Sequence, residues 1–533
     1  MIAGAIEFGN RAVTIPRPEA YPARKTAPIL ERTTAPDAHD MAATSALLTE
    51  GGDSRLTLDP ATGLNRYGCA PRPDPRLSDF GSSTASVIST QALDAADHLR
   101  WRLSQAGPLS AAVYARELDR IRDELKTLCG LEPSTGADVI FAASGTDLHL
   151  LVRELVGGTP SAPLLCVGVE PEETGSGAPA ALAGRHFSTR TALGETVVQG
   201  AAIGPGGGDF VAVRSRTANG ALRDGALVEA DLDAIALSAS SQGRRVLLAV
   251  ADVSKTGLIA PGLNAVLALR RRFPKTVEVL IDACQFRLSP ASLQAYLDND
   301  LMVAMTGSKF LTGPVFCGAL FVPPATAKRM RGRLLTPALR AYSARAEWPQ
   351  DWVAGTALSE ASNEGLLLRW EAALAELRAF RALADADVEQ FVQAFAGAIQ
   401  TRLSDDPRFE PLPTRPLDRS AIGAGQGWDR LPTIFPFLLR QGTGAWLSAA
   451  ATESVYRSVM GGGLGAGARL GQPVSCGERD GAPISALRLC NSARLIVEGV
   501  RDPDAMIGRA LAVLDRAGDV AERMTHAVRM YSW

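Results

Sequence analysis

Histidine and cysteine are scarce in this chain. Only five histidines occur among 533 residues, and they form no cluster with metal-ligand spacing. The seven cysteines are odd in number and scattered without a repeated spacing. These patterns argue against a metal site and against a disulfide framework, and they favour a reducing compartment.

Long apolar runs and an excess of one charge are also missing. No run of about 18 or more apolar residues occurs, so we expect no membrane span. The N-terminal residues lack the sustained apolar stretch of a signal peptide. Lysine and arginine number 55 against 57 acidic residues, a net charge of −2. We therefore expect a cytoplasmic protein with neither a nucleic-acid nor a membrane partner.

The length predicts about two to four domains. Residues 1–55 are rich in Ala, Thr, Pro and charge, which is typical of a flexible N-terminal arm. Residues 56–130 predict a loop followed by helices. Residues 131–350 predict a large α/β domain, and residues 351–533 an interdomain helix and a small C-terminal domain.

Short apolar strands alternate with helices in the central region, a pattern that favours a mostly parallel sheet covered on both faces. We expect strands at 138–143, 164–169, 246–251, 277–281, 301–305 and 315–322, with helices at 146–155 and 263–273. Further along we expect long helices over 363–402, a strand near 433–439, a helix near 445–459, a strand pair around 484–498 and a terminal helix from about residue 503.

Two of the predicted strands end in residues that carry chemistry. The strand at 277–281 runs into Asp282, and the run at 301–305 leads into Thr306-Gly-Ser-Lys309. An acid and a lysine at the ends of buried strands suit one cofactor, pyridoxal 5′-phosphate (PLP). PLP needs a lysine for a Schiff base and an anionic partner for its pyridinium nitrogen.

From about Gly130 to Val500 the chain resembles the fold type I PLP-dependent enzymes. The resemblance is to the aminotransferase class V group, which includes cysteine desulfurases, selenocysteine lyases and kynureninases. It is carried by a D-x-x-Q strand end, Asp282 to Gln285, placed 27 residues before the lysine of an S/T-G-x-K motif (309 − 282 = 27). The resemblance implies a large doubly wound domain with a small α+β C-terminal domain, and a homodimer with shared active sites.

The resemblance also assigns roles around the cofactor. Asp282 would accept the pyridinium N–H, Gln285 would contact the ring oxygen, and Lys309 would form the Schiff base and then transfer a proton. The phosphate would be held by Gly145, Thr146, Thr306 and Ser308, although the family often has histidine at the position of Ser308. Thr356 would reach the phosphate of the neighbouring subunit.

Several of these positions have a second interpretation. The Ser144-Gly145-Thr146 turn is either a phosphate cradle at a helix N-terminus or an ordinary helix cap. Thr356 is either a phosphate ligand or part of a helix-start turn. Arg488, inside an apolar strand, resembles the arginine that grips the substrate carboxylate, and an internal ion pair is the alternative.

The chain departs from the family at three places. Neither a histidine nor an aromatic residue follows the strand at 164–169, so either Thr174 or His186 would lie against the cofactor ring. Lys255 replaces a family asparagine and either meets an acidic group of the substrate or points to solvent. Cys476, 12 residues before Arg488, is either a loop nucleophile, as in desulfurases, or inert.

These patterns predict a PLP-dependent enzyme that acts on an amino acid, by a desulfurase- or lyase-type elimination. An aminotransferase is the alternative reaction. A non-catalytic PLP-binding protein is a second alternative, and an α/β protein that binds a phosphate ligand without PLP is a third.

Overall fold

The computed structural model describes residues 41–530, except 106, 160–161, 205–207, 442–443 and 462–466, and omits the side chains of 525–530. The described residues belong to one compact unit. Most of the predicted N-terminal arm lies outside the described residues. Its described part, 41–55, contains helix α1 (Thr44–Leu47) and the 3₁₀ turn η1 (Ser54–Leu56), and it buries Leu47 and Leu48.

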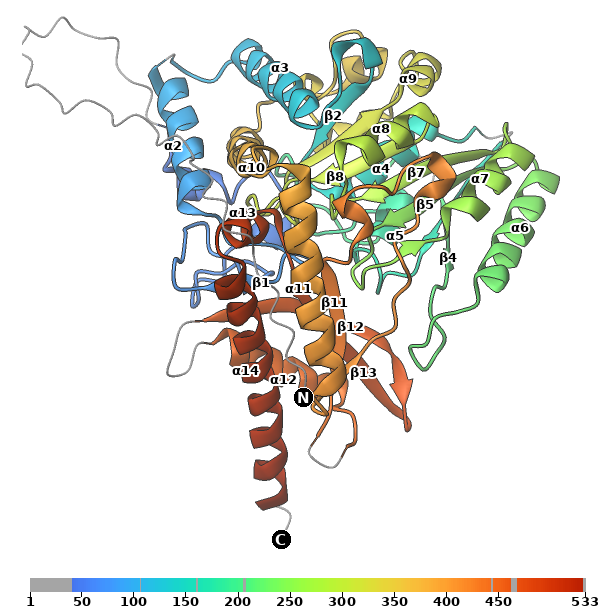
Figure 1. Cartoon of the computed structure of the whole chain (residues 1–533). Coiled ribbons are helices and arrows are strands. Elements are labelled where there is room, and N and C mark those ends of the chain that lie inside the picture. The colour runs from blue at the N-terminus through green and yellow to red at the C-terminus, as the bar shows by residue number, and fades with distance from the viewer. Residues whose placement is uncertain are drawn as a thin grey trace, which may run out of the picture. The chain divides into compact units, whose positions relative to one another are not determined.

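The larger sheet has eight strands, and most pairs of neighbouring strands in it run parallel (Figure 1). Six long-range pairings set the strand order β2 (Asp138–Ala142), β9 (Gly318–Val322), β8 (Met302–Thr306), β7 (Val277–Ala283), β5 (Arg245–Asp252), β3 (Leu164–Val169), β4 (Asp209–Val213). The short strand β6 (Ile259–Ala260) pairs with β5. Strands β8, β7, β5, β3 and β4 are parallel, whereas β9 is antiparallel to both β8 and β2.

Helices cover both faces of this sheet, because its strands are apolar on both sides. Alternate residues point to opposite faces: Ile140 and Leu280 belong to one core, and Val139 and Ile281 to the other. The first core is closed by α4 (Gly145–Val156), α5 (Ala178–Leu182) and α9 (Pro324–Met330). The second is closed by α3 (Ala111–Leu128), α6 (Gly225–Ser241), α7 (Leu263–Arg272), α8 (Pro290–Asp298) and α10 (Glu364–Arg381), with α2 (Thr90–Gln105) packed on α10. The predicted doubly wound α/β fold is confirmed.

The smaller sheet has five strands and draws on both ends of the described chain. Its order is β1 (Ser78–Phe80), β12 (Ala468–Arg479), β13 (Ala482–Cys490), β11 (Ile434–Leu439), β10 (Phe409–Pro411). Helices α11 (Asp385–Asp405), α12 (Ala449–Met460) and α14 (Pro503–Met530) contact its strands, and α13 (Ala493–Arg501) packs against α10, α11 and α14. Figure 1 shows α11 and α14 side by side. Strand β1 joins this sheet by a parallel pairing with β12, Phe80 opposite Leu470.

One element prediction was wrong. The strand pair expected around 484–498 is β12 with β13, which ends at Cys490, and residues 493–501 form helix α13. The side chain of Ser492 caps this helix by accepting a hydrogen bond from the amide of Leu495. Such a cap favours helix over strand for the apolar residues that follow it.

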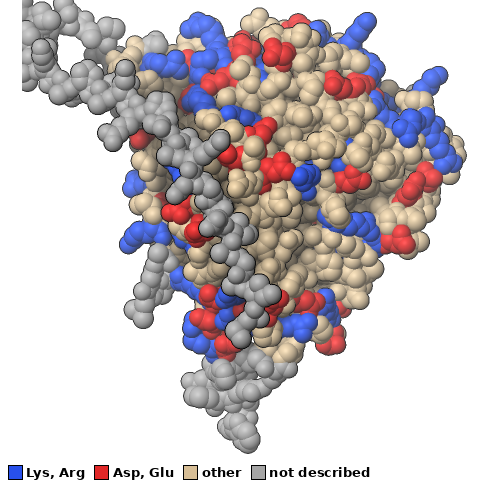
Figure 2. All heavy atoms as spheres, in the orientation of Figure 1, with Lys and Arg blue, Asp and Glu red and all other residues tan. Residues whose placement is uncertain are grey.

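Short 3₁₀ turns complete the described elements, and no long apolar helix is found among them. The turns are η2 (Pro133–Thr135), η3 (Pro337–Ala341), η4 (Arg345–Glu347), η5 (Val353–Ala357), η6 (Ser420–Ile422) and η7 (Trp428–Arg430). Within the described part of the chain, no helix has both the length and the apolarity needed to cross a membrane. On the face drawn in Figure 2, basic and acidic side chains are intermingled.

Candidate active site

A cavity of about 230 Å³ lies where the parallel strands of the large sheet end. The segments that follow β2, β3, β5, β7 and β8 line it, together with residues 55–84 and parts of β12 and β13. Ligands of open α/β sheets bind at this carboxyl edge. The cavity brings together most of the predicted site residues: Gly145, Thr146, Thr174, Lys255, Asp282, Gln285, Thr306, Ser308, Lys309 and Arg488.

Asp282 lies at the end of β7 and is held as an anion. Its Oδ2 atom is 3.1 Å from Nε2 of His149, and its Oδ1 atom accepts a hydrogen bond of 3.1 Å from the amide of Cys284. Burial alone would raise the pKa of this carboxyl, but the charges of His149 and Lys309 and these hydrogen bonds lower it well below its usual range. Asp282 is therefore an ionised acceptor at the floor of the cavity.

Lys309 follows β8 and is half-buried in the wall of the same cavity. Gly307 allows the turn before Lys309 to lie close to α10, because a Cβ atom there would lie 2.7 Å from Ala373 of α10 and 2.7 Å from the sulfur of Cys317. Thr306 donates a 2.7 Å hydrogen bond to the carbonyl of Cys284. The turn that carries the lysine is thus packed against α10 and tied to the strand end that carries Asp282.

The turn between β2 and α4 combines a helix cap with an open cradle. Ser144 is the cap, since its Oγ accepts a 3.3 Å hydrogen bond from the amide of Asp147. Gly145 has no room for a side chain, because its Cβ would lie 2.6 Å from the sulfur of Cys284. Thr146 faces the cavity at the N-terminus of α4, where free amides and the helix dipole favour an anion.

Arg55 lies at this cradle and was missed by the sequence analysis, which placed it at the end of the arm. Its Nη1 donates a 3.2 Å hydrogen bond to Thr146, and its guanidinium is paired with Asp53 at 2.5 Å. The guanidinium also lies 4.7 Å from the ring centroid of Phe316. A phosphate bound at the N-terminus of α4 would meet a cation that is already held in place.

Arg488 lies on β13 and is 1% exposed. Its guanidinium donates to neutral oxygens, namely Thr84 Oγ1 at 3.1 Å, the carbonyl of Lys255 at 3.4 Å and the carbonyl of Gln472. Its Nε has no partner, and no ion pair involving it occurs among the described residues. Burial lowers the pKa of Arg488. A buried cation that faces a cavity without a counter-ion is suited to an anionic ligand.

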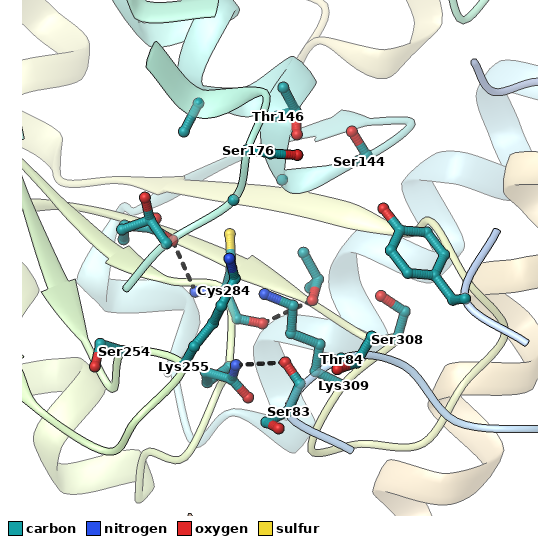
Figure 3. A pocket seen from close by; sticks show the side chains of 18 of the residues that line it. Ser83, Thr84, Ser144, Thr146, Ser176, Ser254, Lys255, Cys284, Ser308 and Lys309 are labelled. Carbon is teal, nitrogen blue, oxygen red and sulfur yellow. Dashed lines mark hydrogen bonds between the residues drawn. The ribbon is translucent and has the colours of Figure 1, made fainter. Parts of the chain in front are cut away.

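Lys255 lines the cavity rather than pointing to solvent (Figure 3). Its Nζ donates a 3.0 Å hydrogen bond to the carbonyl of Pro171. Burial, with the nearby charges of Arg488 and Lys309, lowers its pKa to about 7.

Gln285 and the loop after β3 complete the cavity wall. Gln285 donates a 2.9 Å hydrogen bond to the carbonyl of Ser83, while its Oε1 has no partner among the residues that the structure describes. Thr174 lines the cavity, and beside it the buried carboxylate of Glu173 pairs with Arg216 at 2.8 Å. A buried ion pair therefore lies next to Thr174, one of the two residues expected to lie against the cofactor ring.

Three predicted residues are not among those that line the cavity. His186 contacts the hydroxyl of Tyr342 at 2.6 Å, and the exposed Thr356 donates to the carbonyl of Val353 at 2.7 Å. Cys476, expected on a loop, lies in strand β12 and is buried with Ile484 and other apolar residues. Burial raises the pKa of its thiol to about 11, which disfavours the reactive thiolate.

His149 was also missed, although the sequence holds a signal for it. It lies four residues after Gly145 on α4, one helical turn into the helix, so the cradle and His149 share a face. A buried strand-end acid needs a counter-charge or hydrogen-bond donors. Among the five histidines, His149 lies on the helix that follows the cradle, and this position marks it as the candidate partner of Asp282.

Neither a protein-family model nor a curated protein matches the sequence. Among solved structures, the complex of the cystine C-S lyase C-DES with its reaction product cysteine persulfide aligns with 83% of this chain and 97% of its own, with a TM-score of 0.53 and 18% identity. A C-DES mutant with glycine covalently linked to its PLP cofactor aligns with 84% of this chain and 99% of its own, with a TM-score of 0.52 and 17% identity.

The likeness to these structures is one of fold. The chain has the fold type I architecture of the PLP-dependent enzymes. Its fold is similar to that of C-DES over nearly the whole C-DES chain.

Proposed function

We propose that this protein is a PLP-dependent enzyme that cleaves the carbon–sulfur bond of an amino acid by elimination. The observation that carries the proposal is the placement of three groups in one cavity: Asp282 paired with His149, the half-buried Lys309, and Arg488 without a counter-ion.

The residues present fit the cofactor. Asp282 suits a pyridinium N–H, because its ionised form is favoured by His149 and Lys309. Gln285 has an Oε1 atom without a partner among the described residues, which can contact a polar group of the cofactor. Gly145 has no side chain, which leaves space for the cofactor on the cavity floor. Thr146, Ser308 and Arg55 would hold the phosphate.

PLP, when bound, supplies an electron sink, so that loss of the Cα proton and cleavage of the Cβ–S bond give a thiol and, after addition of water, a 2-oxo acid and ammonium. Lys309 would take the Cα proton at Nζ and return a proton later. Arg488 would bind the substrate carboxylate and so orient the bond that breaks.

The surroundings of Cys476 favour a lyase over a desulfurase that uses a protein thiolate. Such a desulfurase needs a thiolate that reaches the substrate sulfur, and Cys476 is buried in a strand away from the cavity lining. C-DES is described as a C-S lyase, and its structure was solved with the product cysteine persulfide. We therefore place the reaction with the lyases, with sulfur leaving on the product rather than on the protein.

We also propose a homodimer whose two sites share residues. Thr356 is exposed in the single chain, and Gly355 beside it packs against Arg345. An exposed, firmly held threonine is suited to reach a neighbouring subunit. Two chains of 56.1 kDa give 2 × 56.1 = 112.2 kDa, which light scattering after gel filtration would measure.

The experiment that tests the proposed function is an absorption spectrum of purified protein supplied with PLP, beside Lys309→Ala. We expect a visible band of lysine-bound cofactor in the wild type and its loss in the variant, and pyruvate release from cysteine derivatives by the wild type alone. The exposed Lys275, changed to Ala, is the matched control and should keep both properties. Absence of the band and of a borohydride-trapped adduct at Lys309 would rule out the proposal. A strict need for a 2-oxo acid acceptor would replace elimination by transamination.

A further inference from the structure

The cavity contains more cations than the proposed reaction uses. Its lining includes Arg55, Arg66, Lys255, Lys309 and Arg488, against the carboxylates of Asp282 and Glu173. Arg55 is paired with Asp53 at the phosphate cradle, Lys309 is assigned to the cofactor, and Arg488 to the substrate carboxylate. Lys255 and Arg66 remain without a role.

Two carboxylates, those of Glu173 and Glu172, act on Lys255, but their charges do not offset the effect of burial and of the neighbouring cations on its pKa. Glu173 is bonded to the guanidinium of Arg216 at 2.8 Å, to Ser254 at 2.6 Å and to the hydroxyl and amide of Thr256. No ion pair of Lys255 occurs in the described part of the chain, where its ammonium has a single carbonyl as partner. The ammonium is thus partly desolvated, with most of its hydrogen-bonding capacity unused.

The guanidinium of Arg488 contacts the backbone of Lys255, but the two side chains extend toward different walls of the cavity. Arg488 contacts the carbonyl of Lys255, and its other partners are Thr84 and Gln472. The Nζ of Lys255 instead reaches Pro171, at the start of the loop after β3 that lines the cavity through Thr174 and Ser176. Figure 3 shows Lys255 near Lys309, with Ser176 across the cavity. The two cations are therefore placed for two separate anions rather than for one.

We propose that Lys255 binds a second acidic group, carried on the side chain of the amino-acid substrate. The inference rests on the proposed function and names its substrate class: cysteine derivatives whose sulfur substituent ends in a carboxylate or a similar anion. Arg488 binds the α-carboxylate, and the anionic end of the leaving thiol lies at the Lys255 ammonium, below the loop after β3. The lowered pKa of Lys255 in the free protein agrees with a cation that lacks its anion.

A matched pair of substrates tests the proposal. S-carboxymethyl-L-cysteine and S-carbamoylmethyl-L-cysteine have nearly the same shape and differ in the charge of the terminal group. Elimination consumes one water and gives pyruvate, ammonium and either mercaptoacetate or its amide. A hydrogen bond from an ammonium to a carboxylate is stronger than one to a neutral amide, so we expect kcat/KM of the wild type to favour the acid by about 10-fold or more.

Lys255→Gln should abolish this preference because it lowers kcat/KM for the acid alone, and Lys255→Arg should keep part of the preference. The perturbation of the cofactor band by each compound gives a binding constant that does not depend on turnover, and it should show the same loss. Lys275→Gln, at an exposed site, should leave both substrates unchanged.

Three results would overturn the inference. One is an equal kcat/KM of the wild type for both compounds. Another is an equal loss of kcat/KM for both compounds in Lys255→Gln, which would place Lys255 at the α-carboxylate. In either case the cofactor band would still be present, and the proposed function would stand. Loss of the cofactor band in the wild type itself would instead remove the proposed function, and the inference with it.

Discussion

At the scale of single residues, the contact between His149 and Asp282 decides the charge on the cavity floor. The carboxylate is buried, and burial opposes its ionisation. His149, at 3.1 Å, supplies a hydrogen bond and electrostatic stabilisation of the carboxylate that reverse this effect. If PLP binds as proposed, an acceptor that stays ionised would keep a proton on the pyridine nitrogen.

Replacing His149 by Leu should therefore impair catalysis more than cofactor binding. We expect the pKa of Asp282 to rise and kcat to fall by about 10- to 100-fold. This range is typical when a residue that hydrogen-bonds to a group in contact with the reacting centre is removed. Because the carboxylate would then take up a proton at a higher pH, activity on the acid side should be lost at a higher pH than in the wild type. A pH–kcat profile measures this shift, with the exposed His98→Leu as control. An unchanged profile would argue against the role of His149.

The sequence predicted the charged residues of the site better than their partners. Asp282, Lys309 and Arg488 lie at the end of or within apolar strands, where burying an unpaired charge costs free energy. Such charges can therefore be recognised from the sequence alone. His149 and Arg55 reach the site from a helix turn and from a distant segment. Their proximity depends on tertiary packing, which spacing along the chain does not record.

At the scale of secondary-structure elements, strand β1 shows why the small sheet was only partly predictable. Three residues, Ser78–Phe80, lie in a stretch rich in Pro, Gly and Asp, which indicates a loop. They form a strand because β12, almost 400 residues later, offers a free edge. Six strands of the large sheet, by contrast, are largely apolar and were predicted closely from that pattern, whereas the mostly exposed β4 and the two-residue β6 were not predicted.

Phe80 fixes β1 in the core, and its truncation should destabilise the protein. Its side chain is 1% exposed and stacks on Phe395 of α11, with ring centroids 6.4 Å apart. We expect Phe80→Ala to lower the free energy of unfolding by about 3–5 kcal/mol, the usual cost of removing a buried phenyl ring. Urea unfolding measures this change. Leu334→Ala, at a side chain 75% exposed, should change it by less than about 0.5 kcal/mol. Equal effects of the two variants would contradict the assignment of β1 to the core.

At the scale of the whole molecule, buried carboxyls make the stability depend on pH. Glu347, in η4, is buried and accepts hydrogen bonds from Ser343 at 2.7 Å and from Tyr114 of α3 at 3.3 Å. Burial raises its pKa to about 7, although these hydrogen bonds act in the opposite direction. In the unfolded chain the same carboxyl titrates near 4.5.

Glu347 should therefore contribute stability that is present below about pH 4.5 and lost as the pH rises through 7. The folded state holds a proton in this window that the unfolded state has released, so unfolding becomes easier as the pH rises. Between pH 5 and pH 8 we expect the free energy of unfolding of the wild type to fall, relative to Glu347→Gln, by up to about 3 kcal/mol. Denaturant unfolding at both pH values tests this, with the exposed Glu360→Gln as control. A difference that does not change with pH would contradict the assigned pKa.

The pairing of β1 with β12 has a consequence for the order in which the molecule is assembled. A ribosome releases Ser78–Phe80 long before residues 468–470, so β1 must wait for nearly the whole chain to be synthesised. The segment that carries Arg55 precedes β1, and it too contacts partners, such as Phe316, that are made much later. The part of the cavity wall that emerges first is thus completed last, and a truncated nascent chain would hold Lys309 without the finished wall around it.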